Sequence, residues 1–249
     1  MKLEYDALLR GRAALISGGG SDVGRAVAKL FASHGAKVAI WDACADAVEA
    51  SLAALRADAP DIVGFSGALS YEREVNDLYV KVKAVIGPVG VLVNAAGLFI
   101  PGSAEEVSDE DFLKMLEANV LCAVRLTKAA LPDMIAIYRG DIVNITSDLG
   151  AFKSRSGAAA IAACGGALDA FSRCVALDYI RYHVRANCVT YPFDKLPGRK
   201  PLVGEPTPED AANAALWYAC DLSRFVVGDT VPVDGGLQYF AHAQGGAYL

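Results

Sequence analysis

The sequence has little histidine and no closely paired cysteines. It contains three histidines and six cysteines, and no two of these cysteines stand in a C-x-x-C pair. A zinc site needs clustered Cys and His ligands. Scattered cysteines in a chain of this kind are typical of reduced, buried thiols that pack as small apolar side chains. We therefore expect no metal site.

Basic residues are also in deficit, and no long apolar run stands out. The chain has 23 Lys and Arg against 29 Asp and Glu, a formal net charge of −6, and no Lys/Arg cluster. This balance argues against a nucleic-acid partner or an anionic membrane surface. No apolar run reaches the length of a membrane span, and the start, "MKLEYDALLRGR", lacks the apolar region of a signal peptide. We expect a cytoplasmic protein.

What the sequence does contain is a regular alternation of strand and helix patterns over 249 residues. Near-continuous apolar runs are typical of parallel strands that are covered on both faces. We expect such strands at 13–17, 37–41, 61–65, 91–94, 141–146, 184–189 and 229–233. We expect helices after the first strand, with a stop at Gly35, and over roughly 109–136, 158–182 and 208–221. This order predicts α/β class: a single Rossmann-type domain over 1–249, with a doubly wound, seven-stranded parallel sheet and helices on both faces.

Several motifs follow the strands in a fixed order. The glycine-rich "ISGGGSDVGRA" (16–26) joins the first strand to the first helix, where such folds bind a pyrophosphate. Asp42 ends the second strand, 18 residues after Gly24, where a carboxylate can accept hydrogen bonds from ribose hydroxyls. "NAAG" (94–97), Asn119, "GDIVNITSDLG" (140–150) with Ser147, and "VPVDGGLQ" (231–238) follow.

Through these motifs, the chain resembles the short-chain dehydrogenase/reductase family along essentially its whole length. The resemblance implies that NAD is the family's cofactor and that its site survives here as Gly18, Gly24, Asp42, Asn94 and Gly97. It implies for Ser147 the role of polarising a substrate oxygen, and for Asn119 a place in a proton relay. The family's other two catalytic residues are a Tyr and, four residues later, a Lys that lowers the pKa of the Tyr and holds the nicotinamide ribose.

The stretch "SGAAAIAACGGALDAF" (156–171) contains neither Tyr nor Lys. The family spacing from Ser147 places Ala160 at the Tyr position and Cys164 at the Lys position, and a second register would give Ile161 and Gly165. Neither Ala nor Ile can carry a proton, and a thiol is normally uncharged and shorter than Lys. The resemblance therefore implies no catalytic residue in this chain beyond the vestigial Ser147 and Asn119.

Further departures from the family pattern oppose cofactor binding. Asp22 stands in the glycine turn where the family has Gly, and a carboxylate about 5 Å from a phosphate charge costs roughly 3 kcal/mol at an effective dielectric of ~20. Asp22 could also simply cap the helix. Ala68 stands where the family usually has an Asp that contacts adenine, and "VTYPFDK" (189–195) lacks the usual Pro-Gly pair. We expect no tightly bound NAD in this chain.

Three hypotheses follow. The first is a non-catalytic subunit that assembles, as a heterotetramer, with a catalytic homologue that binds NAD, in an NAD-dependent hydroxyacyl-CoA or alcohol dehydrogenase. The small residues of 158–167 would then pack in the core or against a neighbour, and the tail 237–249 would reach a subunit contact. The second is an active enzyme with relocated groups, Tyr191 and Lys153. The third is a nucleotide-sensing module that uses Asp42 and the glycines.

Overall fold

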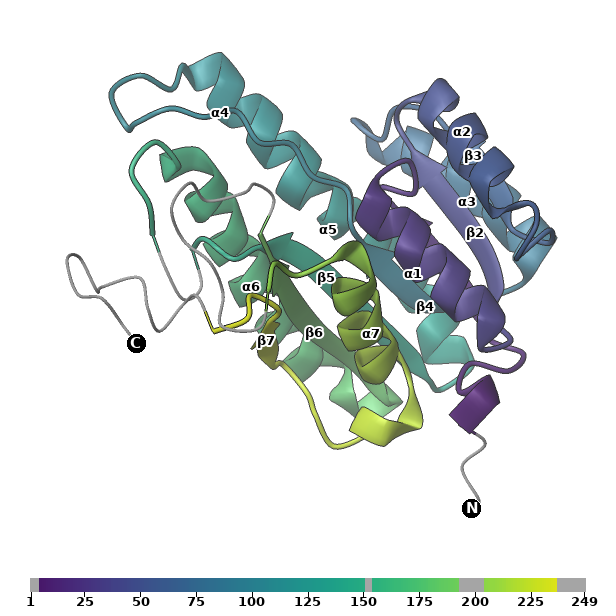
Figure 1. Cartoon of the computed structure of the whole chain (residues 1–249). Helices are drawn as coiled ribbons and strands as arrows, with labels where there is room; N and C mark the ends of the chain where they lie inside the picture. Colours follow the sequence, from purple (N-terminus) through teal and green to yellow (C-terminus); the bar gives the residue numbers. More distant parts are fainter. Residues whose placement is uncertain (1–4, 151–153, 193–203, 237–249) are drawn as a thin grey trace.

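Seven parallel strands form one sheet, in the order β3-β2-β1-β4-β5-β6-β7 (Figure 1). The computed structural model describes residues 5–150, 154–192 and 204–236. Chain order reverses between β1 and β4, and the carboxyl ends of the strands beside such a point form the ligand crevice of this architecture. The strands are β1 Ala13–Ser17, β2 Lys37–Asp42, β3 Val63–Ser66, β4 Val89–Asn94, β5 Gly140–Ser147, β6 Val184–Tyr191 and β7 Thr230–Pro232.

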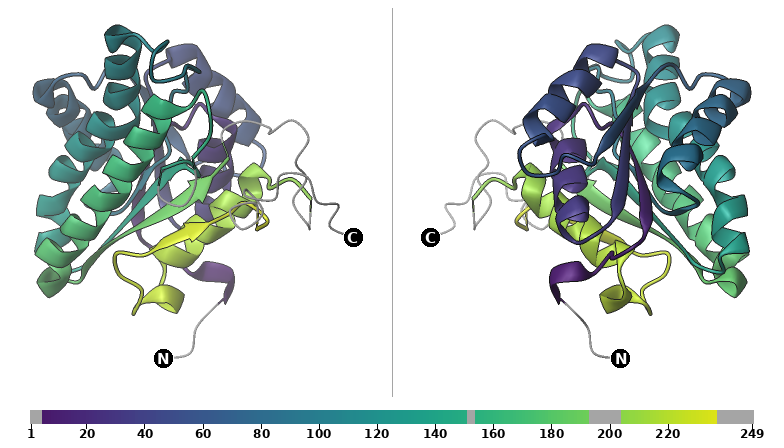
Figure 2. Two further views of the ribbon diagram at one scale, coloured as in Figure 1. Left: turned by 90° about the vertical axis from the view of Figure 1, so that its left-hand side faces the viewer. Right: turned by 90° about the vertical axis from the view of Figure 1, so that its right-hand side faces the viewer.

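Helices cover both faces of the sheet (Figure 2). One apolar core joins the sheet to α1, α2 and α7, through side chains such as Phe31, Val48 and Tyr218. A second joins the opposite face to α3, α5 and α6. The helices are α1 Asp22–Ser33, α2 Ala45–Leu55, α3 Glu72–Ile86, α4 Asp109–Leu116, α5 Cys122–Ala136, α6 Ala159–Tyr179 and α7 Pro208–Ala219. The short turns are η1 Tyr5–Ala7, η2 Glu117–Leu121, η3 Ile180–Tyr182 and η4 Asp221–Ser223.

The predicted architecture is confirmed, with differences in the long helices. The helix expected over 109–136 consists of α4 and α5 joined by η2, a π-helical turn. The helix expected over 158–182 ends in the 3₁₀ turn η3. Helix α1 stops where Gly35 predicted it, because Gly35 has φ +83°, which an L side chain rarely adopts.

Helix α6 is apolar on two sides. Its buried side packs on β5 and β6 and includes Leu168, Val175 and Ala176. The segment Ala159–Tyr182 is, by length and composition alone, long enough and apolar enough to cross a membrane. Half of its apolar window is buried inside the domain, as in a core helix of a globular protein. Asp169 and Arg173 interrupt the segment, so it is not a continuous apolar run.

The exposed side of α6 carries a second apolar row. Its exposed residues include Ala159, Ala163, Ala167, Ala170, Cys174 and Leu177. We call this row the α6 stripe. The small residues of this helix thus pack against the domain on one side and face outward on the other. The helix can therefore contribute both to the core and to a contact with a neighbouring chain, the two alternatives that the sequence left open.

All six cysteines are free, but they are not all buried. Cys44 and Cys174 are exposed, whereas Cys122, Cys164, Cys188 and Cys220 are buried. The prediction of buried thiols was therefore wrong for two of the six. Lys153 and the tail 237–249 lie outside the described residues.

Candidate functional site

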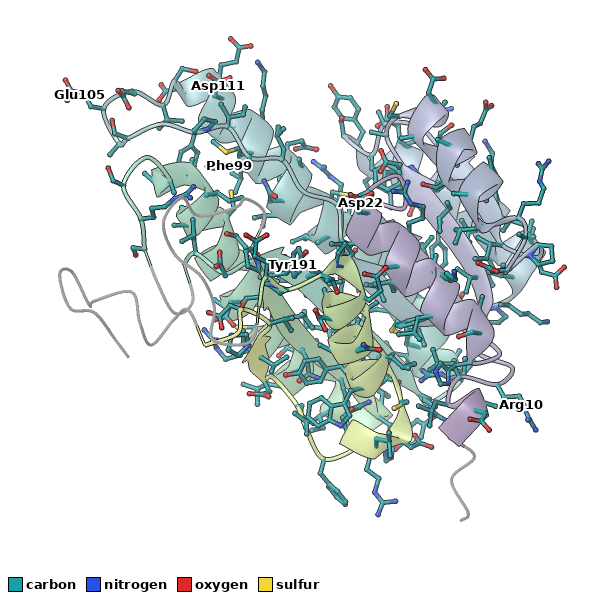
Figure 3. All side chains as sticks on the ribbon, in the orientation of Figure 1. Arg10, Asp22, Phe99, Glu105, Asp111 and Tyr191 are labelled. Carbon is teal, nitrogen blue, oxygen red and sulfur yellow. The ribbon has the colours of Figure 1, made fainter. Side chains whose placement is uncertain are left out.

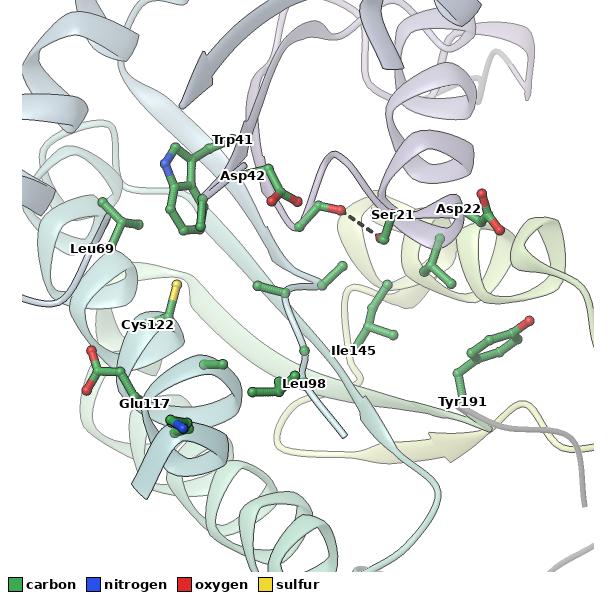
Figure 4. A pocket seen from close by; sticks show the side chains of 18 of the residues that line it. Ser21, Asp22, Trp41, Asp42, Leu69, Leu98, Glu117, Cys122, Ile145 and Tyr191 are labelled. Atoms are coloured by element: carbon green, nitrogen blue, oxygen red, sulfur yellow. Dashed lines mark hydrogen bonds between the residues drawn. The ribbon is translucent and has the colours of Figure 1, made fainter. Parts of the chain in front are cut away.

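A cleft of about 1400 Å³ lies at the carboxyl ends of the strands (Figure 4). The glycine turn before α1, the ends of β2, β3 and β4, helix α4 with η2, and the segment 205–208 contribute its lining. Asp22 and Tyr191 lie at this end of the sheet, opposite the end marked by Arg10 (Figure 3). The cleft therefore occupies the position at which the sequence motifs predicted a dinucleotide site.

The glycines of the turn are required by the chain itself. Gly18 has φ +70°, and a Cβ there would come within 2.5 Å of the backbone of Ala95 and Ala96. A Cβ on Gly24 would overlap the carbonyl oxygen of Gly18. The turn before α1 thus packs directly on the end of β4. The packing of the turn therefore requires both glycines, whether or not a nucleotide binds.

Asp22 lies where α1 begins, at the turn that would face a diphosphate. It is the first residue of the helix, whereas Ser21 is the cap and accepts a hydrogen bond from the N–H of Gly24 at 3.0 Å. The reading of Asp22 as the helix cap was therefore wrong. Its side chain is 77% exposed and pairs with Arg25. Exposure and pairing both reduce the repulsion that Asp22 exerts on an anion, below the value expected from the sequence.

Asp42 lines the cleft and is positioned by backbone N–H groups. Its Oδ2 accepts from Gly20 at 3.0 Å and its Oδ1 accepts from Cys44 at 3.1 Å. Ala68 and Gly97 line the same cleft. Of the sequence-predicted binding residues, the structure therefore places Gly18, Asp22, Asp42, Ala68 and Gly97 around one space.

Asn94 does not line the cleft but joins a buried polar chain. Its Nδ2 donates to Oδ1 of Asn144 at 2.7 Å, and Nδ2 of Asn144 donates to the hydroxyl of Ser172 at 2.7 Å. Ser17 donates to Asn94 at 3.4 Å from the other side. The chain links β1, β4, β5 and α6, so Asn94 connects strands instead of facing a ligand.

Ser147 and Asn119 are buried and held by the backbone around them. The hydroxyl of Ser147 accepts from the N–H of Leu149 at 3.1 Å. Asn119 accepts from the N–H of Leu98 at 3.1 Å and donates to the carbonyls of Leu98 and Met115 at 2.8 and 2.7 Å. These bonds use both hydrogens of the Asn119 amide. Neither side chain lines the cleft.

Ala160 and Cys164 lie inside a small third core. They are 2% and 1% exposed, and their neighbours in this core include Met115, Val120 and Leu149. Burial raises the pKa of Cys164 to about 11, so the group remains a thiol at neutral pH. Ile161 and Gly165, the positions in the alternative register, are also buried.

The segment after β4 covers this core. Gly102 pairs with Ala158 in an isolated parallel bridge, and its N–H donates to the carbonyl of Gly157 at 2.9 Å. Arg155 lies 5.6 Å from the ring centroid of Phe99, over the ring face. The positions expected for Tyr and Lys therefore lie inside a packed interior, separate from the cleft.

Tyr191, the candidate relocated group, does line the cleft. Its hydroxyl donates to the carbonyl of Pro206 at 3.2 Å. Burial, followed by the nearby charges of Asp210, Glu209 and Asp22, raises its pKa. A raised pKa opposes the phenolate form that a general base requires. Lys153, its proposed companion, lies outside the described residues.

The sequence reading missed one wall of the cleft. Glu110, Leu113, Lys114, Glu117 and Cys122 from α4, η2 and α5 line it, together with Trp41 from β2. The sequence shows the spacing of the helical residues among these. It does not show which side of the helix faces the cleft, because that depends on the π-helical turn η2. Among the described residues, no three His, Cys, Asp or Glu side chains are grouped so that they could hold a metal ion.

The sequence profile of short chain dehydrogenases matches residues 12–195. The chain belongs to the short chain dehydrogenase family. It is 32% identical to 2,5-dichloro-2,5-cyclohexadiene-1,4-diol dehydrogenase LinX of Sphingobium indicum over 242 residues, which cover 92% of this chain and 96% of the relative. It is 33% identical to 3-oxoacyl-[acyl-carrier-protein] reductase of Bos taurus over 236 residues, which cover 90% and 96%.

A solved structure from Burkholderia xenovorans, described as a short-chain dehydrogenase/reductase, superposes with a TM-score of 0.88. It is 30% identical in sequence, and the match covers 94% of this chain and 98% of that one. The chain therefore keeps the family fold. Ala160 and Cys164, which the sequence predicts at two catalytic positions, lie in a closed core.

Proposed function

We propose that this short-chain dehydrogenase is a non-catalytic subunit of an NAD-dependent dehydrogenase complex. The observation that carries the proposal is the burial of Ala160 and Cys164 in an apolar core. Helix α6 contains no Lys, and its one Tyr is its last residue, Tyr179. A general acid–base pair is typically worth ~10²–10⁴-fold in rate, and neither member has a substitute at these positions.

The residues around the cleft fit NAD poorly. Asp22 adds negative charge at the diphosphate position, Ala68 removes a polar contact for adenine, and Cys164 cannot reach the nicotinamide ribose from within its core. The loss of NAD affinity is modest for Asp22, because this side chain is exposed, and larger for Ala68 and Cys164. We propose that NAD is bound by the partner subunit and only weakly, or not at all, by this one.

The α6 stripe supports assembly. Six exposed, uncharged residues follow one another at spacings of four, four, three, four and three, which is the spacing of a helix–helix contact. The same helix also exposes two charged residues, Arg173 and Asp178. Leu177 at its end is 76% exposed. A second pair of exposed apolar residues lies in and after η4, where Phe225 is 87% exposed and Leu222 is 40% exposed. Contiguous exposed apolar surface of this kind marks protein contacts.

We propose that the partner is a catalytically complete member of the same family and that the complex is a cytoplasmic heterotetramer. The overall pattern resembles the inactive subunit of the heteromeric 2-[hydroxy(phenyl)methyl]succinyl-CoA dehydrogenase of anaerobic toluene degradation. On this proposal the complex oxidises a hydroxyacyl-CoA or a related alcohol, and this chain contributes contacts instead of catalytic groups. The short-chain relatives named above are dehydrogenases and reductases, in line with that reaction class.

The test is a turnover and binding assay on the purified chain. We expect no oxidation or reduction of alcohols, ketones or 3-hydroxyacyl-CoA thioesters with NAD or NADP, and weak or undetectable NAD binding by calorimetry. Tyr191→Phe separates the alternatives. Turnover that disappears in Tyr191→Phe supports an active enzyme with a relocated acid, and micromolar NAD binding without turnover supports a nucleotide sensor. Either result contradicts the subunit proposal as stated.

A further inference from the structure

Exposed apolar and aromatic side chains gather at the end of the sheet opposite to the cleft. Helices α5, α6 and α7 end there, and strands β5, β6 and β7 begin there (Figure 1). The turns that join these elements leave large side chains in contact with solvent. We call the following residues the amino-end surface: Ile137, Tyr138, Ile180, His183, Leu222 and Phe225.

The amino-end surface is continuous across three turns. The rings of Tyr138 and His183 meet edge to face, with 4.7 Å between their centroids, and join the turn before β5 to the turn before β6. Arg139 pairs with Asp221 at 2.6 Å and joins the end of α5 to η4. Phe225 follows η4 by two residues. The three turns therefore present their side chains side by side.

Tyr138 and His183 have backbone conformations that bulky residues rarely adopt. Their φ angles are +55° and +56°, in the left-handed region where a helix usually ends on Gly. Burial does not compensate for this strain, because Tyr138 is 55% exposed and His183 is also exposed. The chain thus holds two aromatic rings in solvent at a conformational cost that Gly would avoid. Strain of this kind is typical of positions with a function.

The amino-end surface also lies among an excess of positive charge, unlike the chain as a whole. The charged residues in and next to its turns are five arginines and four aspartates: Arg12, Arg139, Arg181, Arg185, Arg224, Asp141, Asp178, Asp221 and Asp229. One positive charge is therefore in excess, whereas the formal net charge of the chain is −6. A local reversal of sign favours a partner that brings carboxylates.

Two of these arginines lie over aromatic rings. Arg181 lies 4.8 Å from the ring centroid of Tyr182, and Arg224 lies 5.0 Å from that of Phe225. Within the part of the chain that the structure describes, neither guanidinium forms an ion pair, whereas Arg139 does. A guanidinium that is stacked on a ring can still donate two parallel hydrogen bonds to a carboxylate.

We infer that the amino-end surface docks an acidic segment of another protein, in which carboxylates flank an apolar side chain. The apolar side chain packs on Phe225 and on the pair of Tyr138 and His183. The carboxylates accept hydrogen bonds from Arg181 and Arg224. Aromatic residues and Arg are enriched at the centres of protein interfaces, where they contribute most of the binding energy.

Two other occupants fit the amino-end surface less well. Nucleic acid also stacks on aromatic rings beside Arg, but a chain with a net charge of −6 repels such a polyanion. A purely apolar partner would leave the guanidinium groups of Arg181 and Arg224 without acceptors. The inference goes beyond the proposed function. It concerns a surface at the opposite end from the cleft, so it holds whether or not the chain is catalytic.

The experiment is photo-crosslinking of the full chain in its own host, with Phe225 replaced by p-benzoylphenylalanine. Peptide mass spectrometry then identifies the crosslinked segment. We expect a protein segment with at least two carboxylates within about five residues of the crosslink, a spacing set by the reach of one strand. The same replacement at Tyr71 is the control, because Tyr71 is 72% exposed at the start of α3 and lies outside the amino-end surface.

Charge reversal tests the arginines. The double variant Arg181→Glu, Arg224→Glu should lower the crosslink yield at Phe225 at least about tenfold, because carboxylates would then face carboxylates. Arg56→Glu, Lys81→Glu is the matched control, since it makes the same change of charge at exposed positions of other elements. Equal yields in the two double variants overturn the inference. So does a crosslink to nucleic acid or to a segment without carboxylates, or a yield no higher than that at Tyr71.

Tyr138→Gly separates docking from a merely structural role of the strained ring. Gly adopts the left-handed conformation freely, so the melting temperature of this variant should be unchanged or higher. The crosslink yield at Phe225 should nevertheless fall, because part of the apolar contact is lost. An unchanged yield together with a lower melting temperature contradicts the inference. Neither readout depends on NAD binding or turnover, so the failure of this inference and the failure of the proposed function can be told apart.

Discussion

Gly165 of α6 lies directly against the carbonyl oxygen of Leu149, and a Cβ at position 165 would overlap that oxygen. Leu149 follows β5 by two residues, and its N–H donates to the hydroxyl of Ser147. Helix α6 is therefore pressed onto the residues that follow β5, next to Ser147 at the end of that strand. This contact has consequences for stability that can be measured.

The first prediction compares two neighbouring glycines of α6. Gly165→Ala should lower the free energy of unfolding by roughly 1–3 kcal/mol, because the new methyl group overlaps the backbone of Leu149. Gly166→Ala has open space around its Cβ and should be neutral or stabilising by up to about 1 kcal/mol, since Ala favours a helix over Gly. Chemical denaturation measures both. Equal effects of the two substitutions would show that the close contact is absent.

The second prediction concerns restoration of the family's residues. The double variant Ala160→Tyr, Cys164→Lys should be inactive and destabilised, because it places a ring and a charge inside a packed core. Overpacking typically costs about 1–3 kcal/mol, and a buried unpaired charge adds to this. Ala163→Lys is the control, since it places the same charge on the exposed side of the same helix. Turnover in the double variant would indicate that the core opens readily into the cleft.

Much of the fold followed from the sequence, because buried parallel strands have a simple pattern. The runs at 13–17 and 37–41 correspond to β1 and to all but the last residue of β2. The run expected at 61–65 begins two residues later, at Val63, since Asp61 and Ile62 belong to the turn that follows α2. Strand boundaries depend on where pairing with a neighbour starts, and the sequence alone does not show this.

The site was predictable in position but not in the direction of its side chains. Gly18 and Asp42 could be placed because their spacing from the strand ends fixes them. Asn119 and Ser147 also occur where expected, yet their side chains bond to the backbone of Leu98 and Leu149. Those bonds depend on how the segment after β4 closes over α6, a long-range contact that local patterns do not record.

The third prediction uses thiol reactivity. At pH 8, a thiol reagent should label Cys44 and Cys174 of the folded chain quickly, because they are exposed. Cys122 and Cys164 should remain unlabelled, since burial raises their pKa values to about 12 and about 11, and the reactive thiolate is then scarce below those values. Peptide mass mapping identifies the labelled sites. Fast labelling of Cys164 would contradict the closed core.

The fourth prediction concerns the α6 stripe. Leu177→Asp should leave the isolated chain folded, because Leu177 is 76% exposed, but it should weaken assembly by placing a charge in the contact. Val80→Asp is the control: Val80 is 67% exposed on α3 and lies outside the stripe. Size-exclusion chromatography with the partner present compares the two variants. If neither substitution changes assembly, the α6 stripe is not part of the interface.

Purification of this chain from its own host through an affinity tag tests whether it is a non-catalytic subunit. Native mass spectrometry of the product then reports its composition. We expect a tetramer that combines this 26.1 kDa chain with a second chain of the same family that retains Tyr and Lys at the positions of Ala160 and Cys164. A product whose masses are only whole multiples of this chain's own mass would contradict it.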